Sequence, residues 1–244
     1  MELVVLGSGG GWATAGGTAC GYLVRHDGFD LWVDAGTGTL ANLQRHIGLL
    51  DLDAVVISHR HFDHFLDLYP YYLARVYRDD SPPPIPLFAP PGMFEHAARI
   101  EGSLADAYSS EPVQPGDTFE AGPFRIATAP MRHPVPTLGM RIEAGGRTLA
   151  YSADSGPNDE LALLSKGADL LLCEATFDEA QSRRREPIHM NGQEAGEVAA
   201  RAGAAALVLT HIWPTNDREE TRRQAASVFG GPVTLAEEGL KLAL

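Results

Sequence analysis

The segment Ser58-His59-Arg60-His61-Phe62-Asp63-His64 has the pattern His-x-His-x-Asp-His and holds three of the nine histidines of the chain. It follows the β-branched run Val55-Val56-Ile57, which predicts a buried strand. Imidazole nitrogens and carboxylate oxygens hold zinc and similar divalent ions, and four such groups in six residues can reach two ions. A solvated polar loop is the alternative, but histidines that only satisfy hydrogen bonds rarely cluster so densely. The segment therefore predicts a metal site just past the end of a strand.

Strand and helix patterns alternate on both sides of this segment, which predicts a single α/β domain over residues 1–244. The expected strands are 3–6, 55–57, 124–128, 169–173, 206–210 and 233–235, and the expected helices are 40–47, 160–164, 191 onward and 217–228. Hairpins are expected to turn at Asp27-Gly28 and at Gly145-Gly146. Asn191 and Glu194 form an Asn variant of the capping box. The two halves share a hairpin followed by βα units, which predicts two sheets packed together with helices outside.

Two segments rich in proline or glycine need separate interpretation. Residues 81–91 hold six prolines around Ile85, Leu87 and Phe88, and we expect a rigid loop around a short edge strand. The cluster Gly7–Gly11 lacks the glycine at position 12 that a dinucleotide fingerprint requires, because Trp12 stands there, and Gly17 replaces the lysine of a P-loop. We expect a flexible turn at the edge of the site.

Composition limits the classes of protein to which the chain can belong. At 244 residues, 44% hydrophobic and 21% charged, it can bury a core, which excludes disorder. No apolar run approaches the roughly 18 residues of a spanning helix, and no basic segment precedes the first apolar stretch. We expect a soluble, cytoplasmic protein without a membrane partner. Cys20 and Cys173 are too few for a disulfide framework. The net charge of −13 disfavours diffuse binding of nucleic acid.

The order of the motifs along the chain resembles that of the metallo-β-lactamase superfamily. Asp34-Ala35-Gly36 resembles its Asp-x-Gly, and His133, Asp154 and His211 each follow a predicted strand as its later ligands do. The resemblance implies an αββα sandwich, in which two mixed β-sheets are flanked by helices. It also implies one metal held by His59, His61 and His133, a second held by Asp63, His64 and His211, and Asp154 bridging them.

The implied pair of metals indicates a hydrolase. A hydroxide that bridges two cations is a nucleophile at neutral pH. Asp63 is expected to orient or deprotonate the water, and Asp34 to orient a ligand histidine rather than to bind metal. His and Asp ligands accept Zn, which we expect first, and also Mn or Fe.

Two later segments resemble the RNase Z-like phosphodiesterase branch. They are Glu174-Ala175-Thr176-Phe177 and Ile188-His189-Met190-Asn191. In that branch the Glu and the His act together beside the metals, which implies that Glu174 and His189 are catalytic. A Glu–His pair can hold an imidazolium that touches phosphate or protonates a leaving alkoxide. The alternative is that Glu174 caps a strand end and His189 is a surface residue.

Between those segments lies the run Arg183, Arg184, Arg185. Such a run is usually a solvated loop, but arginine forks also match phosphate oxygens. Both interpretations remain open from the sequence.

The substrate is expected to be a small phosphodiester, with a cyclic nucleotide as the leading candidate. The tRNA-processing RNase Z enzymes carry a long basic arm, in many members between the third-ligand histidine and the bridging aspartate. Here a single short hairpin separates His133 from Asp154, and Asp67 stands where those enzymes usually have glycine. The continuation Asp63-His64-Phe65-Leu66-Asp67-Leu68 is similar to that of small cyclic-nucleotide phosphodiesterases, among whose relatives homodimers are common.

Two other hypotheses belong to different classes. The first is a lactone, thioester or amide hydrolase, or less plausibly a tRNA 3′-processing endonuclease, because the scaffold does not set the substrate. The second is a metal-stabilised binding protein without turnover. The filled set of ligand positions disfavours the second.

Overall fold

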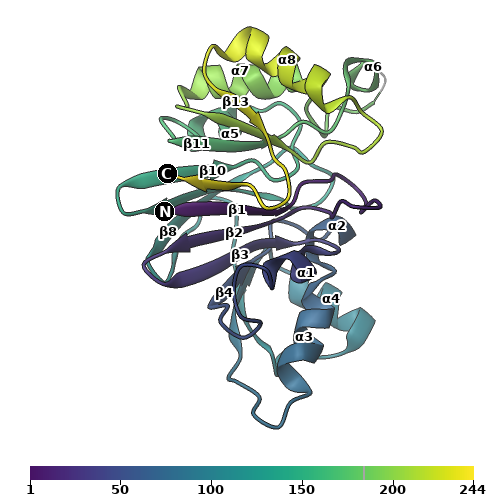
Figure 1. The fold of residues 1–244 in the computed structure, drawn as a ribbon, viewed down its shortest axis with the longest axis vertical. Coiled ribbons are helices and arrows are strands. Elements are labelled where there is room, and N and C mark those ends of the chain that lie inside the picture. Colours follow the sequence, from purple (N-terminus) through teal and green to yellow (C-terminus); the bar gives the residue numbers. More distant parts are fainter. Residues whose placement is uncertain (184) are drawn as a thin grey trace.

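The computed structural model describes residues 1–183 and 185–244, which form two seven-stranded mixed sheets packed face to face (Figure 1). The first sheet has the strand order β14-β1-β2-β3-β4-β5-β6. Its strands are β1 (Glu2–Gly7), β2 (Gly21–His26), β3 (Phe29–Ala35), β4 (Ala54–Val56), β5 (Ile85–Ala89), β6 (Tyr108–Pro112) and β14 (Lys241–Ala243). Strands β14 to β3 pair antiparallel and β3 to β6 pair parallel. The predicted hairpin at Asp27-Gly28 is confirmed.

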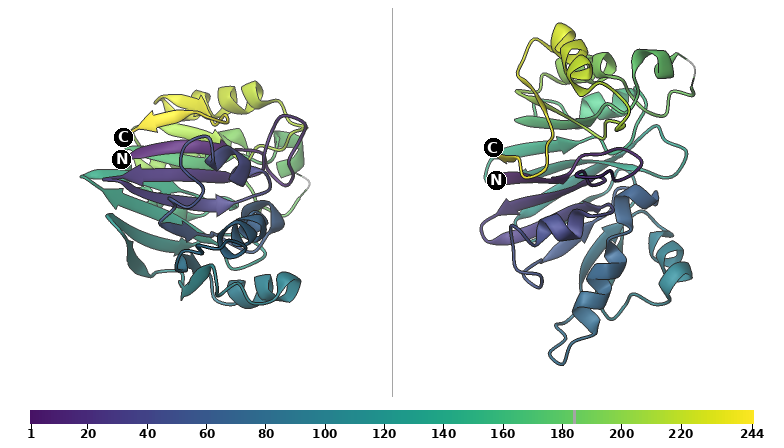
Figure 2. Two further views of the ribbon diagram at one scale, coloured as in Figure 1. Left: turned by 60° about the horizontal axis from the view of Figure 1, so that its bottom comes forward. Right: turned by 45° about the vertical axis from the view of Figure 1, so that its right-hand side comes forward.

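The second sheet has the order β13-β12-β11-β10-β9-β8-β7. Its strands are β7 (Thr118–Ala121), β8 (Phe124–Pro130), β9 (Leu138–Ala144), β10 (Arg147–Tyr151), β11 (Leu170–Glu174), β12 (Leu207–Thr210) and β13 (Val233–Leu235). Strands β7 to β10 pair antiparallel and β10 to β13 pair parallel. The last strand, β14, returns to the first sheet beside β1, so the two ends of the chain lie next to each other (Figure 2).

Helices cover the outer face of each sheet, which completes the predicted αββα sandwich (Figure 1). The helices beside the first sheet are α1 (Thr39–Leu43), α2 (Phe62–Phe65), α3 (Leu68–Val76) and α4 (Met93–Glu101). Those beside the second sheet are α5 (Asp159–Leu164), α6 (Glu179–Ser182), α7 (Gly192–Ala202) and α8 (Arg218–Phe229). Asn191 and Glu194 form the predicted capping box at the start of α7. In the described part of the chain, no helix has the length and apolarity needed to cross a bilayer.

Three apolar layers hold the sandwich together. The inner layer lies between the sheets, where Tyr22 of the first sheet meets Tyr151 of the second with ring centroids 5.2 Å apart. The outer layers lie under the helices of each sheet and include Trp32 on one side and Leu171 on the other. Burial of apolar area at about 25 cal/mol per Å² makes these layers the main stabilising term. The two sheets are therefore joined by their own core.

The predicted edge position of the proline-flanked strand is wrong. Strand β5 lies inside the first sheet, because β6 pairs with it along its whole length, from Ile85↔Tyr108 to Ala89↔Pro112. Ile85 and Ala89 make their backbone hydrogen bonds toward β6. Successive residues of a strand form their hydrogen bonds with opposite neighbours, so position 86 is directed toward β4, where Pro86 has no N–H to donate. The pairing of β4 with β5 includes only Leu87 and Phe88. Pro86 therefore costs no hydrogen bond of that ladder.

Candidate metal centre

Every predicted ligand lies in a loop that follows a strand, or in the short helix into which that loop leads, at one end of the sandwich. The loop after β4 carries His59 and His61 and leads into α2, whose first turn contains Asp63 and His64. The second sheet supplies His133 after β8, Asp154 after β10 and His211 after β12. The carboxyl ends of neighbouring parallel strands meet at one edge of a sheet, which brings residues distant in sequence together.

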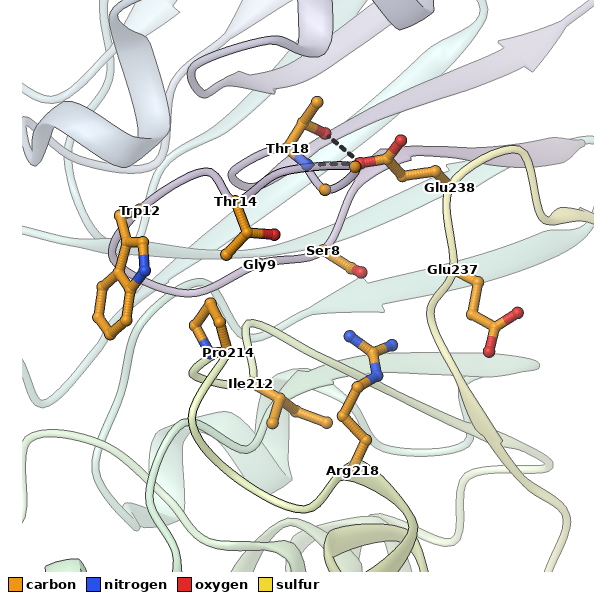
Figure 3. Close-up of a pocket in the computed structure, with 12 residues that line it drawn as sticks. Ser8, Gly9, Trp12, Thr14, Thr18, Ile212, Pro214, Arg218, Glu237 and Glu238 are labelled. Atoms are coloured by element: carbon orange, nitrogen blue, oxygen red, sulfur yellow. Dashed lines mark hydrogen bonds between the residues drawn. The ribbon is translucent and has the colours of Figure 1, made fainter.

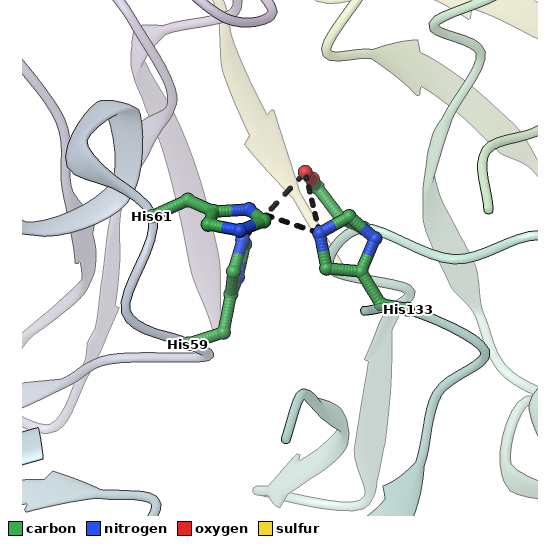
Figure 4. A group of neighbouring side chains, drawn as sticks. His59, His61 and His133 are labelled. Atoms are coloured by element: carbon green, nitrogen blue, oxygen red, sulfur yellow. Dashed lines mark hydrogen bonds and ion pairs between the residues drawn. The ribbon is translucent and has the colours of Figure 1, made fainter. Parts of the chain in front are cut away.

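The seven side chains form two adjoining groups. In the first group, ligand atoms of His59, His61, His133 and Asp154 lie within 4.8 Å of one another. Figure 4 shows the three histidines of this group. His133 Nε2 lies 3.0 Å from His61 Nδ1, and Asp154 Oδ2 lies 3.7 Å from His59 Nε2. In the second group, His211 Nε2 lies 3.2 Å from His64 Nε2 and 3.1 Å from Asp63 Oδ2.

Asp154 faces both groups. Its Oδ1 lies 3.3 Å from the Nε2 atoms of His64 and His211, whereas its Oδ2 faces His59 and, at 3.8 Å, His133. The structure thus brings together all seven residues in the two sets that the resemblance implies. Their role as ligands stays a prediction.

The ring nitrogens that face away from the site have hydrogen-bond acceptors. His64 Nδ1 lies 2.8 Å from Asp34 Oδ2 and His211 Nδ1 lies 2.7 Å from Thr176 Oγ1. Because the Thr176 hydroxyl donates to His211 O, the network assigns the Nδ1 proton to His211. The same reasoning applies to His59 Nδ1, whose partner Ser58 Oγ donates its own proton to Asp34. Such contacts fix the orientation of ligand imidazoles.

This tautomer assignment shows that the donor set fits a metal. With Nδ1 protonated, the Nε2 lone pairs of His64 and His211 face each other across 3.2 Å, beside two carboxylates. Only a cation, either a proton or a metal ion, relieves that repulsion. In addition, the buried atoms His59 Nε2 and Asp154 Oδ1 have no hydrogen-bond partner among the described residues. An orphaned buried polar atom is costly unless it binds an ion.

The electrostatics agree with this assignment. Burial lowers the pKa of His59 well below its usual value and that of His133 to about 4, so both rings are neutral near pH 7, as metal ligands must be. Around His64, the carboxylates of Asp154, Asp63 and Asp34 outweigh burial and raise its pKa. The second group therefore favours positive charge where the first favours neutral imidazole.

Asp34 lies where a residue that orients His64 would lie, and that role stays a prediction. Its carboxylate is fully buried and accepts hydrogen bonds from Ser58 N, Ser58 Oγ and Tyr151 Oη at 2.7 to 2.8 Å, besides that from His64. Its backbone lies in the left-handed region, with φ at 56°, a conformation that Asp and Asn tolerate better than most residues. Asp34 lies behind His64 and not among the candidate ligand groups.

Glu174 and His189 lie together beside the ligands. His189 Nδ1 lies 2.8 Å from Glu174 Oε1, and the fully buried Glu174 carboxylate also accepts the backbone N–H groups of Ser155, Thr176 and Met190. Although burial opposes it, Glu174 raises the pKa of His189 to about 9. A ring nitrogen of His189 lies within 4.8 Å of ligand atoms of Asp154 and His211. Because His189 Nδ1 is bound to Glu174, Nε2 is the ring nitrogen that faces the two ligand groups.

The glycine cluster borders the site, as expected. The backbone N–H of Gly11 donates to Asp63 Oδ2 at 2.8 Å, and a Cβ at Gly10 would lie 2.5 Å from His211 O, so only glycine fits there. The loop that begins with the glycine cluster ends near Thr18. Glu238 holds this end by accepting hydrogen bonds from the Thr18 N–H and, at 2.9 Å, from the Thr18 hydroxyl (Figure 3). A pocket of about 350 Å³ opens against the loop, and none of the seven candidate ligands lines it.

In the described part of the run at 183–185, the two arginines contact residues outside the two ligand groups. Arg184 lies outside the described residues, and Arg183 makes an ion pair with Glu179. The Arg185 guanidinium lies over the rings of Phe177 and Trp213 rather than against the ligands.

Asp67, which stands where RNase Z enzymes usually have glycine, accepts the backbone N–H of Leu40 at 2.7 Å and so holds the start of α1.

Some residues that shape the site were not predicted from the sequence. Ser58 and Thr176 set the tautomers of His59 and His211, and Gly11 binds Asp63. Ser58 and Thr176 stand beside predicted motifs, so a search for hydroxyls next to ligand positions would have found them. Gly11 offered no comparable signal, because the contact is made by its backbone.

Three comparisons with known proteins, by family model, by sequence and by structure, identify the same family. The model of the beta-lactamase superfamily domain matches residues 30–212. The probable metallo-hydrolase YhfI of Bacillus subtilis is 35% identical over 250 residues, covering 98% of both chains. The crystal structure of this metallo-beta-lactamase fold protein superposes with a TM-score of 0.90, over 99% of this chain and 98% of that one, at 32% identity.

Two further relatives have names that specify an activity. Ribonuclease Z of Thermobifida fusca is 28% identical over 302 residues, covering all of this chain and 94% of that protein. The crystal structure of a new diphosphatase from the PhnP family superposes with a TM-score of 0.80 at 22% identity, covering all of this chain and 97% of that one. The second likeness shows the fold alone.

Proposed function

The chain belongs to the metallo-β-lactamase superfamily and has the fold and donor set of a metallo-hydrolase, and we propose that it is a metal-dependent phosphodiesterase that acts on small phosphodiesters. A cyclic nucleotide is the leading substrate. The two groups of donors would hold two divalent ions, with Zn first and Mn or Fe as alternatives.

The Glu174–His189 pair is the observation that carries this proposal. Hydrolysis of an alkyl phosphodiester expels an alkoxide, which is strongly basic and needs a proton as the P–O bond breaks. His189 Nδ1 is held by Glu174, so Nε2–H is left to face the site and can donate to the leaving oxygen. A thioester expels a thiolate, which leaves without that help, so the pair favours substrates with an alkoxide leaving group; a lactone or ester also expels an alkoxide, and the activity screen below separates it from a phosphodiester.

The remaining residues position the reactants. Bound divalent ions would supply an activated water and neutralise the phosphate oxygens. Asp63 is 13% exposed, so it is more accessible than His64 or Asp154, and its Oδ2 accepts the Gly11 N–H and lies 3.1 Å from His211 Nε2. A carboxylate in that position can accept a proton from water or orient it. His59, His64 and Asp154 are almost fully buried and can only hold cations.

The fold favours a small substrate over tRNA. Strands β9 and β10 connect the loop of His133 to Asp154 through a turn at Gly145-Gly146, with no inserted segment. The alignment with ribonuclease Z extends over 302 positions, whereas this chain has 244 residues, so the relative has segments without a counterpart here. The net charge of −13 also opposes binding of a long polyanion.

An activity screen of metal-reconstituted protein tests the proposal. The substrates would be 3′,5′-cyclic AMP, cyclic and linear dinucleotides, bis-p-nitrophenyl phosphate, a tRNA precursor and a panel of lactones and thioesters. We expect turnover of the small phosphodiesters, and loss of that turnover in the Asp63→Asn variant. Turnover of lactones or thioesters with none of any phosphodiester would overturn the proposal, as would cleavage of the tRNA precursor alone.

A further inference from the structure

Four side chains form a cluster beside the metal centre, which we call the aromatic platform: Trp12, Phe177, Arg185 and Trp213. The Trp213 ring lies 6.0 Å from Trp12 and 5.5 Å from Phe177, measured between centroids. The Arg185 guanidinium lies 5.1 Å from the Trp213 centroid and 5.8 Å from that of Phe177. The four residues come from four separate loops, so the fold alone brings them together.

The platform is continuous with the site. The Phe177 ring lies 5.0 Å from that of His189, and His189 in turn stacks on His211 at 5.8 Å. On the other side, Gly11 lies between the platform and Asp63, because its N–H binds the Asp63 carboxylate while a Cβ added to it would lie 3.5 Å from Trp213 Nε1. A substrate held at the metal ligands therefore has the platform within its reach.

Packing accounts for the buried Phe177 but not for Trp12. Trp12 is 45% exposed and stands on the glycine loop, whereas Trp32, the other tryptophan of the chain besides Trp213, is fully buried in the core. An exposed indole loses the apolar burial that stabilises a core residue, so its size contributes little to folding. Phe177 is buried and Trp213 half-buried, whereas Trp12 and Arg185 are exposed, and an exposed indole beside a second indole and an arginine is a usual surface for a stacked planar group.

We propose that the aromatic platform binds the nucleobase of a nucleotide substrate by stacking against Trp12 and Trp213, while the phosphodiester lies at the metal ligands. This inference rests on the proposed phosphodiesterase function and names its substrate class. Stacking accepts every base, because each has a π-face, so the platform confers preference for nucleotides over simple phosphodiesters rather than for one sequence. Arg185 adds local positive charge to a protein whose net charge is −13.

Kinetics with a matched pair of substrates test the platform. The variants are Trp12→Leu and Trp213→Leu, with Tyr77→Leu as the control, since Tyr77 is 76% exposed and lies at the end of α3 outside the platform. The substrates are 3′,5′-cyclic AMP and the methyl riboside 3,5-cyclic phosphate, which lacks a base. We expect the KM for cyclic AMP to rise by about 10-fold in the platform variants, with kcat nearly unchanged, and the KM of the abasic substrate to stay constant. Equal changes for both substrates, or none, would overturn the platform.

A binding measurement gives a second readout that needs no turnover. Adenosine monophosphate should quench the tryptophan fluorescence of the wild-type protein, because two of the three tryptophans belong to the platform and Trp32 is buried. Ribose 5-phosphate at matched saturation should not. Nucleotide binding by calorimetry without a fluorescence change would contradict the platform. Failure of every phosphodiester to turn over would instead remove the proposed function, so the two failures are distinguishable.

Discussion

The two halves of the molecule supply the same kinds of ligand in different ways. The first sheet contributes His59, His61, Asp63 and His64 from one short segment after β4. The second sheet contributes His133, Asp154 and His211 from three loops, and adds the Glu174–His189 pair. A segment can hold several ligands when it turns directly into a helix, as here at α2. Ligands spread over three strand ends depend on the sheet for their relative position.

This difference assigns the two halves different parts of the chemistry. In the proposed function, the first half is a compact set of donors that would position cations. In the proposed function, the second half supplies the bridging carboxylate and the Glu174–His189 pair that would face the leaving group. The site therefore exists only where the inner core holds the sheets together, which gives the comparison several points at which it can be tested.

Removal of metal has the largest expected effect. A chelator should abolish hydrolysis, while far-UV circular dichroism at 25 °C stays unchanged, because three apolar layers hold the fold without help from the site. The melting temperature should fall. If the chelator instead unfolds the protein cooperatively at 25 °C, the metals and not the core join the halves.

The bridging residue should matter more than a ligand of one group. Asp154→Ala should lower occupancy of both metals, because each of its oxygens faces one group, and should reduce activity by about 1,000-fold. His61→Ala should lower occupancy of one metal only, and Asp80→Ala, at an exposed position, of neither. Elemental analysis of the three variants decides the order. Equal metal content in Asp154→Ala and His61→Ala would contradict a bridge.

The orienting residue of the first sheet should have an intermediate effect. Asp34→Asn keeps the shape and tolerates the positive φ, but it disturbs the acceptor for His64 Nδ1. We expect metal affinity to fall by about 10- to 100-fold, measured by competition with a chelator. Tyr151→Phe removes only one donor to the same carboxylate and should have a smaller effect. An unchanged affinity in Asp34→Asn would mean that packing alone orients His64.

Loss of the hydrogen bonds between Glu238 and the glycine loop should have the smallest effect of the changes considered, and it should act on stability. Glu238→Ala removes the acceptor of the Thr18 N–H and hydroxyl, so we expect the free energy of unfolding to fall by about 1 kcal/mol. The neighbouring Glu237 makes no side-chain hydrogen bond within the described residues, and Glu237→Ala should be neutral. Chemical denaturation measures both. Equal losses in the two variants would indicate a general charge effect.

The comparison of the halves also explains how much could be predicted from the sequence. The dense first motif needs no tertiary information, because its spacing alone brings donors together. His133, Asp154 and His211 could be proposed only from the order of motifs in a family, since a lone His or Asp after a strand has no distinctive chemistry. The capping box at Asn191 was predicted correctly because it is a local interaction.

The failures have physical causes. Strand β6 carries an exposed polar sequence without alternation, so nothing indicated that it would pair with β5. Helix α3 was not predicted because it contains Pro70, which lies in the first turn, where a missing amide costs no helix hydrogen bond. The aromatic platform joins loops about 200 residues apart in sequence, which only the fold could bring together.

The loss of kcat in the His189→Ala variant, compared between substrates with different leaving groups, tests the central claim most directly. Cyclic AMP expels a basic ribose oxygen, whereas bis-p-nitrophenyl phosphate expels a phenolate that needs no proton. If His189 donates that proton, kcat for cyclic AMP should fall by about 100-fold and that for bis-p-nitrophenyl phosphate much less. Glu174→Gln should follow the same pattern more weakly, because it loosens the hold on His189 Nδ1. Equal losses on the two substrates, or no loss on either, would contradict the account.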